Sequence, residues 1–192
     1  MFRLISVFCF WIKKWKIEHD LLPQLGLKKF ILIGAPHTSN WDIVYFLGAI
    51  RKMKLKPSFL IKNFWMRFPF GMMFKPLGGL SIDRSQKDET SGASMVRSMV
   101  ELFEQSEKMI IAIAPEGTRS KNPNWKKGFY HTALQANIPI LLGYLDYKNK
   151  VAGISKAIIP SGDIVKDMIE INSFYAQFEG KNPIQFAQWL DQ

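Results

Sequence analysis

Two short apolar runs constrain the fold of this chain most, at residues 30–35 (FILIGA) and 109–114 (MIIAIA). Neither run carries a charged side chain, which is typical of a buried strand. Runs of this kind alternate with stretches of helical periodicity, such as residues 89–105, where Met99 and Phe103 fall on one face. This alternation predicts an α/β fold with a central, mostly parallel or mixed sheet flanked by helices.

The other expected elements follow the same alternation. No internal repeat, low-complexity tract or linker interrupts them, so we expect a single domain. Asp163 is well placed to cap the last helix. Further strands are expected at 58–61, 79–82, 138–144 and 151–159, and further helices at 43–50, 128–136 and 163–178.

Charge is distributed unevenly along the chain. The 192 residues include 26 Lys and Arg and 16 Asp and Glu, a net charge of +10. Residues 1–80 contain 13 basic and 3 acidic side chains, so the whole excess lies there. A basic segment predicts a polyanionic partner, either an anionic membrane surface or a nucleic acid. The single cysteine excludes a disulfide scaffold and a Cys-based zinc cluster, and the apolar content of 47% excludes disorder.

The N-terminal segment is apolar over residues 1–12 and strongly basic directly after them. As a helix the apolar part would extend ~18 Å, which is short of the ~30 Å hydrocarbon core of a bilayer. Apolar residues followed by Trp and Lys suit a helix that lies in a membrane interface. We therefore divide the chain into a membrane-interface helix (1–20) and one main domain (21–192). The alternative is an ordinary helix whose aromatic face packs on that domain.

The sharpest local feature is the segment from His37 to Asp42, which follows the run at 30–35. Open α/β folds place their sites beyond the carboxyl ends of strands, and a histidine there can act as a general base at neutral pH. Such a base needs a partner that fixes its tautomer, and Asp42 can turn back to provide one. The alternative is that Ser39 and Asp42 cap the next helix and that backbone groups satisfy His37.

Two later segments also place polar side chains after a strand. Residues 115–120 (PEGTRS) combine a glycine, two hydroxyls and Arg119, whose guanidinium matches the geometry of a phosphate. Residues 79–84 (GLSIDR) offer Arg84 as a second phosphate ligand. Taken alone, the first segment could be a surface turn and the second a surface ion pair.

In this order the segments closely resemble the glycerolipid acyltransferase family, whose type member is 1-acylglycerol-3-phosphate (lysophosphatidic acid) acyltransferase. The family has a His-x4-Asp box, a Gly-x-x-x-Asp-Arg segment, a Pro-Glu-Gly-Thr-Arg-Ser box and a late strand with proline. Residues 37–42, 79–84, 115–120 and 138–141 match these blocks. The resemblance implies that residues 21–192 are an acyltransferase domain at the cytoplasmic face of a membrane, held there as a peripheral or monotopic protein.

The resemblance also implies the reaction and the role of each matching residue. An acyl group would pass from acyl-CoA or acyl-ACP, as co-substrate, to the free hydroxyl of a lysophospholipid, giving phosphatidic acid from 1-acylglycerol-3-phosphate. His37 would be the general base and Asp42 would orient it. No metal or other cofactor is implied. The substrate-binding residues would be Lys62, Arg84, Glu116, Gly117, Thr118 and Arg119.

Three alternatives stay open at this point. The acceptor could be a different lyso-lipid. The protein could be a lipid hydrolase with Ser39 as nucleophile beside His37 and Asp42, although no Gly-x-Ser-x-Gly segment is present. The basic first half also permits a nucleic-acid-binding module, but the sequence has no motif for one, so we expect no nucleic-acid partner.

Overall fold

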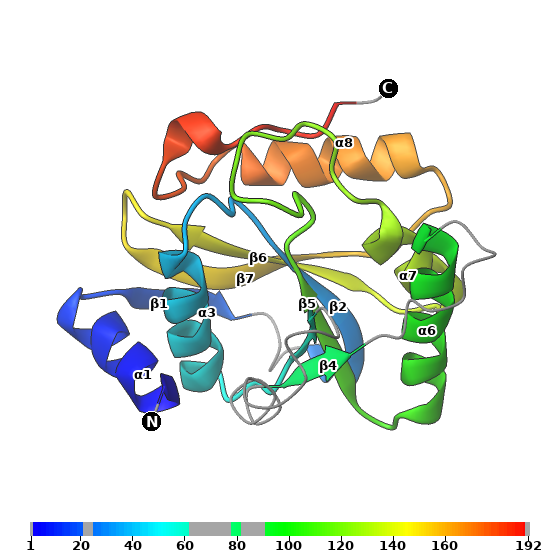
Figure 1. Cartoon of the computed structure of the whole chain (residues 1–192), viewed down its shortest axis with the longest axis horizontal. Coiled ribbons are helices and arrows are strands. Elements are labelled where there is room, and N and C mark those ends of the chain that lie inside the picture. The colour runs from blue at the N-terminus through cyan, green and yellow to red at the C-terminus, as the bar shows by residue number, and fades with distance from the viewer. Residues whose placement is uncertain (1, 21–24, 62–77, 82–90, 191–192) are drawn as a thin grey trace.

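The computed structural model describes residues 2–20, 25–61, 78–81 and 91–190. Within these residues strands and helices alternate as the sequence predicts, and the α/β class is confirmed (Figure 1). The strands are β1 (Lys16–Asp20), β2 (Lys29–Gly34), β3 (Ser58–Ile61), β4 (Gly79–Ser81), β5 (Met109–Ile113), β6 (Ile140–Asp146) and β7 (Val151–Ile158). The helices are α1 (Phe2–Ile12), α3 (Trp41–Lys52), α6 (Ser91–Gln105), α7 (Gly128–Gln135), α8 (Ile164–Tyr175) and the short 3-10 helix η2 (Pro183–Gln185).

The described strands form one mixed sheet in the order β1-β7-β6-β2-β5-β3-β4. β6 and β7 pair antiparallel, while the other neighbouring strands pair in parallel. The mostly parallel or mixed sheet that the alternation predicts is therefore present. Because β2 lies at the centre between β6 and β5, the segment that follows it emerges in the middle of one sheet edge.

The side chains of β2 show how the sheet separates two layers of core. Ile31 and Ile33 belong to the larger cluster, which includes buried side chains of α6, α7 and α8. Phe30 and Leu32 belong to a cluster on the opposite face, where α3 packs. Adjacent strand residues point to opposite faces, so one apolar run contributes to both layers. Figure 1 shows α8 on one side of β6 and β7, with α1 beside α3 at the N-terminal edge.

The N-terminal segment differs from the expectation of one helix over residues 1–20. The helix α1 ends at Ile12, a turn with Lys14 at φ +57° follows, and residues 16–20 join the sheet as β1 beside β7. The sequence KIEHD has no apolar alternation; its strand forms by backbone pairing with β7 at the sheet edge, with Ile17 partly buried against the core. The structure contains no helix, among those it describes, that is both long and apolar enough to cross a membrane.

Close packing of α1 on α3 depends on one glycine. A Cβ at Gly48 would lie 2.9 Å from the Cβ of Phe10 and 2.9 Å from the carbonyl oxygen of Ser6. Only glycine therefore lets the two backbones approach this closely. The adjoining Trp15 is buried and stacks on Tyr45 of α3, with 4.6 Å between ring centroids. The N-terminal element is thus fixed to the helix that carries Asp42.

Candidate active site

Two loops that follow neighbouring strands build the site. In the register of β2 and β5, Ile33 lies opposite Ile113. Parallel strands end at the same edge of a sheet, so the segments after Ile33 and Ile113 emerge side by side. The first segment is the histidine loop (residues 35–40), and the second is the arginine loop (residues 114–121). The register of two buried strands thereby brings together motifs that lie about 80 residues apart, as the 79-residue separation of His37 and Glu116 shows.

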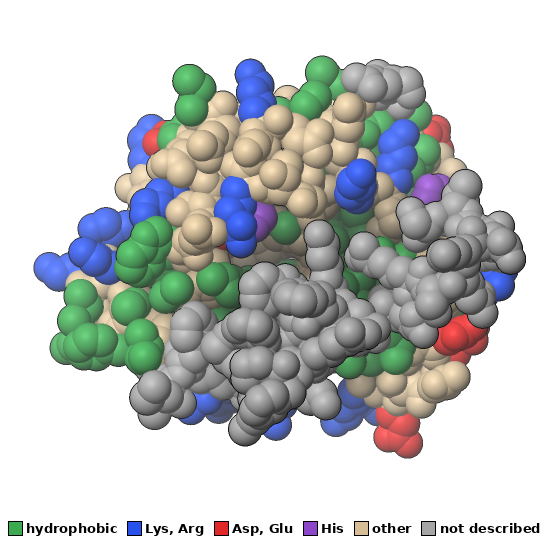
Figure 2. Space-filling view, in the orientation of Figure 1, with side chains coloured by type: hydrophobic (Ala, Val, Ile, Leu, Met, Phe, Trp, Pro, Cys, Tyr) green, Lys and Arg blue, Asp and Glu red, His purple; other side chains and the backbone are tan. Residues whose placement is uncertain are grey.

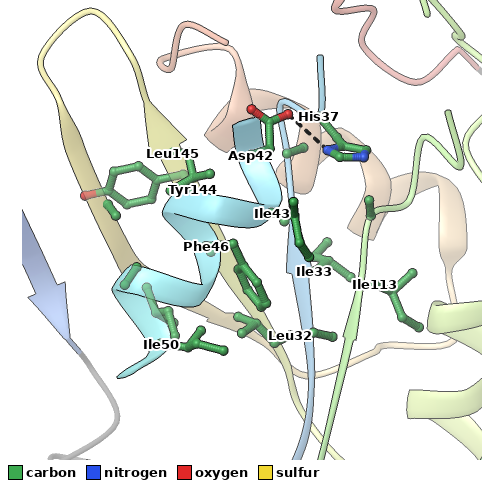
Figure 3. A pocket seen from close by; sticks show the side chains of 18 of the residues that line it. Leu32, Ile33, His37, Asp42, Ile43, Phe46, Ile50, Ile113, Tyr144 and Leu145 are labelled. Atoms are coloured by element: carbon green, nitrogen blue, oxygen red, sulfur yellow. Dashed lines mark hydrogen bonds and ion pairs between the residues drawn. The ribbon is translucent and has the colours of Figure 1, made fainter. Parts of the chain in front are cut away.

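His37 and Asp42 form a hydrogen-bonded pair. The Nδ1 atom of His37 lies 3.0 Å from Oδ2 of Asp42, and the histidine side chain is 24% exposed while the aspartate side chain is 6% exposed (Figure 3). An ionised carboxylate can only accept a hydrogen bond, so this contact places the proton of neutral His37 on Nδ1. Nε2 then keeps its lone pair and can accept a proton from a substrate. The sequence predicted this pair, with the required turn between its members.

Asp42 is held by further donors. The backbone N–H groups of Thr38 and Ser39 each donate to Oδ2 at 2.9 Å. The hydroxyl of Tyr147 donates to Oδ1 at 2.6 Å. Asp42 also lies in the first turn of α3, where the helix dipole favours a negative charge. Asp42 therefore does not cap α3: Asn40 occupies the N-cap position without a side-chain cap hydrogen bond, and Asp42 accepts N–H groups of the loop before the helix while it contacts His37.

Glu116 is fully buried beneath the histidine loop. Its Oε1 accepts the backbone N–H of His37 at 2.6 Å, while Oε2 has no hydrogen-bond partner among the described residues. Loss of hydration on burial raises the pKa of Glu116 from 4.5 to about 8; the N–H of His37 opposes this rise, and the charge of Asp42 adds to it. The Glu116 carboxyl is therefore mainly neutral at pH 7 and fixes the backbone of the histidine.

Residues 117–121 of the arginine loop face solvent. Gly117 adopts φ +68°, a left-handed conformation that favours glycine, and its N–H donates to the carbonyl of Ala114 at 3.1 Å. The Oγ1 of Thr118 accepts the N–H of Ser120 at 3.2 Å. The side chains of Thr118 and Arg119 are exposed, so the guanidinium is accessible to a ligand.

A C-terminal strap, residues 176–190, braces both loops. Asn182 donates its side-chain Nδ2 to the carbonyl of Thr38 at 2.8 Å, and its backbone N–H to Oγ1 of Thr38 at 3.1 Å. Gln185, in the amide orientation that satisfies its neighbours, donates to the carbonyls of Thr38 and Arg119 at 2.9 Å each. The indole N–H of Trp125 donates to the carbonyl of Ala187 at 2.9 Å. The strap thus connects the histidine loop to the arginine loop.

An apolar pocket of about 210 Å³ opens beside the dyad, between α3 and the sheet. His37 and Asp42 lie at one end, and Phe46, Leu32 and Ile50 line the part farther from them (Figure 3). A Cβ at Gly34 would meet no atom within 4 Å, so this position borders open space. Ala49, Ala112, Ala114 and Ala152 also line the pocket, whereas a Cβ at Gly143 or Gly153 would meet the side chain of Leu32 or Tyr144.

The structure brings together some of the residues that the sequence singled out. His37 contacts Asp42 through its side chain and Glu116 through its backbone N–H. The exposed residues of the arginine loop follow Glu116 directly in the chain. Lys62 and Arg84 lie outside the described residues. No three His, Cys, Asp or Glu side chains gather as a metal site within the part of the chain that the structure describes.

Sequence reasoning missed Tyr147, Asn182 and Gln185. Tyr147 is 105 residues from Asp42, and Asn182 is 144 residues from Thr38. No local pattern marks these residues, because they act through contacts that only the folded chain creates. A polar residue soon after the end of the last helix was the one available signal, and it is too common to indicate a role.

A histidine hydrogen-bonded to a carboxylate at one end of an apolar pocket is an arrangement that can remove a proton from a partly apolar substrate. The family comparison gives the reaction type. The family model described as Acyltransferase matches residues 16–141, which include the histidine and arginine loops. The match covers more than half of the chain, and the protein belongs to the acyltransferase family. Membership supports O-acyl transfer to a lipid. A comparison with curated proteins finds no match.

Proposed function

We propose that the protein transfers an acyl group from acyl-CoA or acyl-ACP to the free hydroxyl of a lysophospholipid. The acceptor that we propose is 1-acylglycerol-3-phosphate, which gives phosphatidic acid. The observation that carries the proposal is the His37–Asp42 pair at the end of an apolar pocket. A fatty acyl chain matches an apolar pocket, and a chain seated there would leave its thioester carbonyl near His37.

In the proposed reaction His37 acts as general base. Its Nε2 takes the proton of the acceptor hydroxyl while that oxygen attacks the thioester carbonyl and forms a tetrahedral intermediate. Asp42 stabilises the imidazolium through the Nδ1 contact of 3.0 Å. Collapse of the intermediate breaks the carbon–sulfur bond, and the imidazolium returns its proton to the departing thiolate. The products are the new ester and the free thiol, and His37 is regenerated.

The acceptor phosphate requires cationic ligands, and the arginine loop offers one. The Arg119 side chain is exposed three residues after Glu116, which contacts His37, and Gln185 joins the backbone carbonyls of Arg119 and Thr38. A guanidinium can hold two phosphate oxygens through parallel hydrogen bonds. We propose Arg119 as the phosphate ligand, with Lys62 and Arg84 as further ligands and with Gly117 and Thr118 shaping the loop.

The proposed site of action is the cytoplasmic face of a membrane, with the protein attached as a peripheral or monotopic protein. Phe8 and Trp11 of α1 are 57% and 68% exposed, and Ile5 and Ile12 are also exposed. Figure 2 shows hydrophobic side chains gathered over α1 with basic side chains close by. An apolar helix face followed by exposed lysines at 13, 14 and 16 has the composition of a helix that binds an anionic bilayer surface.

The central test is thiol release from acyl-CoA in the presence of 1-acylglycerol-3-phosphate. We expect His37→Ala to lower kcat roughly 10²–10⁴-fold, because it removes the base. His131→Ala is the matched control, since His131 is an exposed histidine of α7, and it should keep wild-type kcat. Equal rates for wild type and His37→Ala would refute the mechanism.

The acceptor and the membrane need separate measurements. Mass spectrometry of products from a mixture of lyso-lipids would identify the acceptor, and free fatty acid as the main product would instead indicate hydrolysis.

For the membrane, we expect co-sedimentation with phosphatidylglycerol vesicles to weaken in Phe8→Ala/Trp11→Ala and at high salt. Binding that is unchanged in this variant would exclude α1 as the contact.

A further inference from the structure

The carboxylate of Asp42 is held from two sides. Its Oδ2 accepts hydrogen bonds from His37 and from the backbone N–H groups of Thr38 and Ser39, all within one short segment. Its Oδ1 accepts the hydroxyl of Tyr147 at 2.6 Å, from a residue that follows β6 and is 105 residues away. The short segment fixes one oxygen, and a distant element fixes the other.

We propose that Tyr147 is a positioning residue for the dyad, which sets the rotation of the Asp42 carboxylate so that His37 is held as its Nδ1–H tautomer. The terminal torsion of an aspartate is broad, and its planar carboxylate rotates as one unit, so a donor on either oxygen restrains both oxygens. The donors to Oδ2 belong to the segment that carries the dyad, whereas the Tyr147 hydroxyl restrains the same rotation from a separate element. This inference rests on the proposed function for its consequence in catalysis, but not for its consequence in the geometry of His37.

Tyr147 is itself rigidly placed. Its ring packs edge-on against Trp15 at 5.0 Å and against Tyr45 at 5.6 Å, with interplanar angles of 90° and 87°. Its backbone N–H donates to the carbonyl of Glu179 in the C-terminal strap at 2.9 Å. Contacts from the N-terminal element, from α3 and from the strap therefore converge on this one residue. Such a fixed ring can hold its hydroxyl in a single direction.

The hydroxyl also remains a donor at the pH where an acyltransferase works. Burial, together with the hydrogen bond to Asp42 and the negative charge of that residue, holds the pKa of Tyr147 well above its usual value. The proton of Tyr147 is consequently always available to Oδ1. Tyr147 does not touch the reacting atoms, because Asp42 stands between it and His37.

The test compares Tyr147→Phe with Tyr45→Phe in the full-length protein. Both substitutions remove one hydroxyl from rings that pack on Trp15, but only the first removes a donor to Asp42. We expect Tyr147→Phe to lower kcat for acyl-CoA and 1-acylglycerol-3-phosphate about 10- to 100-fold with little change in KM. Tyr45→Phe should stay within about twofold of wild type.

A second readout does not depend on turnover. In ¹⁵N-histidine spectra, His37 of the wild type should show one dominant Nδ1–H tautomer, assigned by its loss in His37→Gln. Tyr147→Phe should mix the tautomers or broaden the signal, whereas Tyr45→Phe should not. If Tyr147→Phe lowers the melting temperature, 3-fluorotyrosine at position 147 keeps both ring and donor and should restore kcat to within about threefold.

The outcomes separate this inference from the proposed function. Wild-type kcat together with an unchanged His37 spectrum in Tyr147→Phe would overturn the positioning role. An inactive wild type with a perturbed His37 spectrum in Tyr147→Phe would refute the proposed substrates and leave the positioning role supported. A fall in kcat of the same size in Tyr45→Phe would show that the aromatic cluster, and not the hydroxyl, is responsible, and would also overturn it.

Discussion

The histidine loop and the arginine loop follow neighbouring parallel strands, yet they are built in opposite ways. In the histidine loop, the N–H groups of His37, Thr38 and Ser39 all donate to buried carboxyl groups. In the arginine loop, residues 117–121 are exposed, and the hydrogen bonds that they make use backbone groups and one hydroxyl. The guanidinium of Arg119 extends into solvent from a braced backbone.

The difference fits the two roles that the proposed function gives these loops. A general base must be oriented before the substrate arrives, because any reorientation during the reaction adds to the barrier. A side chain that binds an incoming phosphate must stay hydrated and accessible until the phosphate displaces the bound water. We therefore expect substitutions in the histidine loop to alter kcat and substitutions in the arginine loop to alter KM.

The largest expected effect is that of Asp42→Asn. The amide keeps the shape of the carboxylate but loses the charge that stabilises the imidazolium, and its NH₂ group would face donors. We expect kcat to fall roughly 10²–10⁴-fold. Thiol-release kinetics would measure this, with a thermal unfolding curve as the check on folding. A loss smaller than about tenfold would mean that Asp42 serves the loop and not the base.

The next effect concerns stability and comes from Glu116. In the folded protein its raised pKa of about 8 keeps the carboxyl protonated, whereas the unfolded chain releases that proton near pH 4.5. Between these values the unfolded state binds fewer protons, so the free energy of unfolding falls as pH rises from about 4.5 to about 8. We expect this component, on the order of 5 kcal/mol over that pH range, to be absent in Glu116→Gln, whose amide oxygen can still accept the N–H of His37.

Denaturant titrations at a series of pH values would measure this component as the difference between wild type and Glu116→Gln. The difference should move in favour of the variant as pH rises through 5, 6, 7 and 8, about the range set by the two pKa values. Parallel pH profiles of the two proteins would show that the carboxyl ionises in the folded state at its ordinary pKa.

A smaller effect is expected from Arg119→Ala. Loss of the charge-assisted hydrogen bonds to the acceptor phosphate should raise KM for 1-acylglycerol-3-phosphate about tenfold and leave kcat within about twofold. Lys121→Ala, which removes an exposed cation of the same loop, is the matched control and should change KM much less. If both substitutions raise KM equally, the loop attracts the acceptor by its net positive charge. Arg119 would then not be a specific ligand of the phosphate.

The smallest effect is expected from Ser39→Ala. The Oγ of Ser39 accepts the N–H of Trp41 at 3.2 Å, which is a contact at the start of α3. Because this contact is exposed, its loss should cost no more than about 1 kcal/mol of stability and change turnover less than about twofold. Steady-state kinetics and denaturant unfolding would measure both quantities. Abolished turnover would instead support the hydrolase alternative with Ser39 as nucleophile.

The sequence predicted the parts of the molecule that depend on local pattern. The apolar run at 30–35 became β2, and Asp163 caps α8 by accepting the N–H of Lys166 at 3.1 Å. His37 and Asp42 are close in the chain, so their spacing allowed the contact, and the resemblance of residues 37–42 to the His-x4-Asp box favoured it over the capping alternative.

Features that depend on tertiary structure were not predicted. Strand β1 has the charged sequence KIEHD and forms at the sheet edge through backbone pairing with β7, which leaves no periodic signal. The burial of Glu116 and the donor role of Tyr147 arise from segments that are distant in sequence. Such contacts require the strand order, and alternation alone does not specify that order.

The C-terminal strap has a consequence for the order of events during synthesis. Asn182 and Gln185 clamp the backbone of Thr38, and Glu179 holds Tyr147, so the geometry of the histidine loop relies on residues translated long after it. While the nascent chain still lacks residues 179–185, the base and its carboxylate are already present but are not braced. The braced geometry of the histidine loop therefore forms only after residues 179–185 have been translated, and a ribosome that stalls before this point releases a chain that contains His37 and Asp42 without their brace.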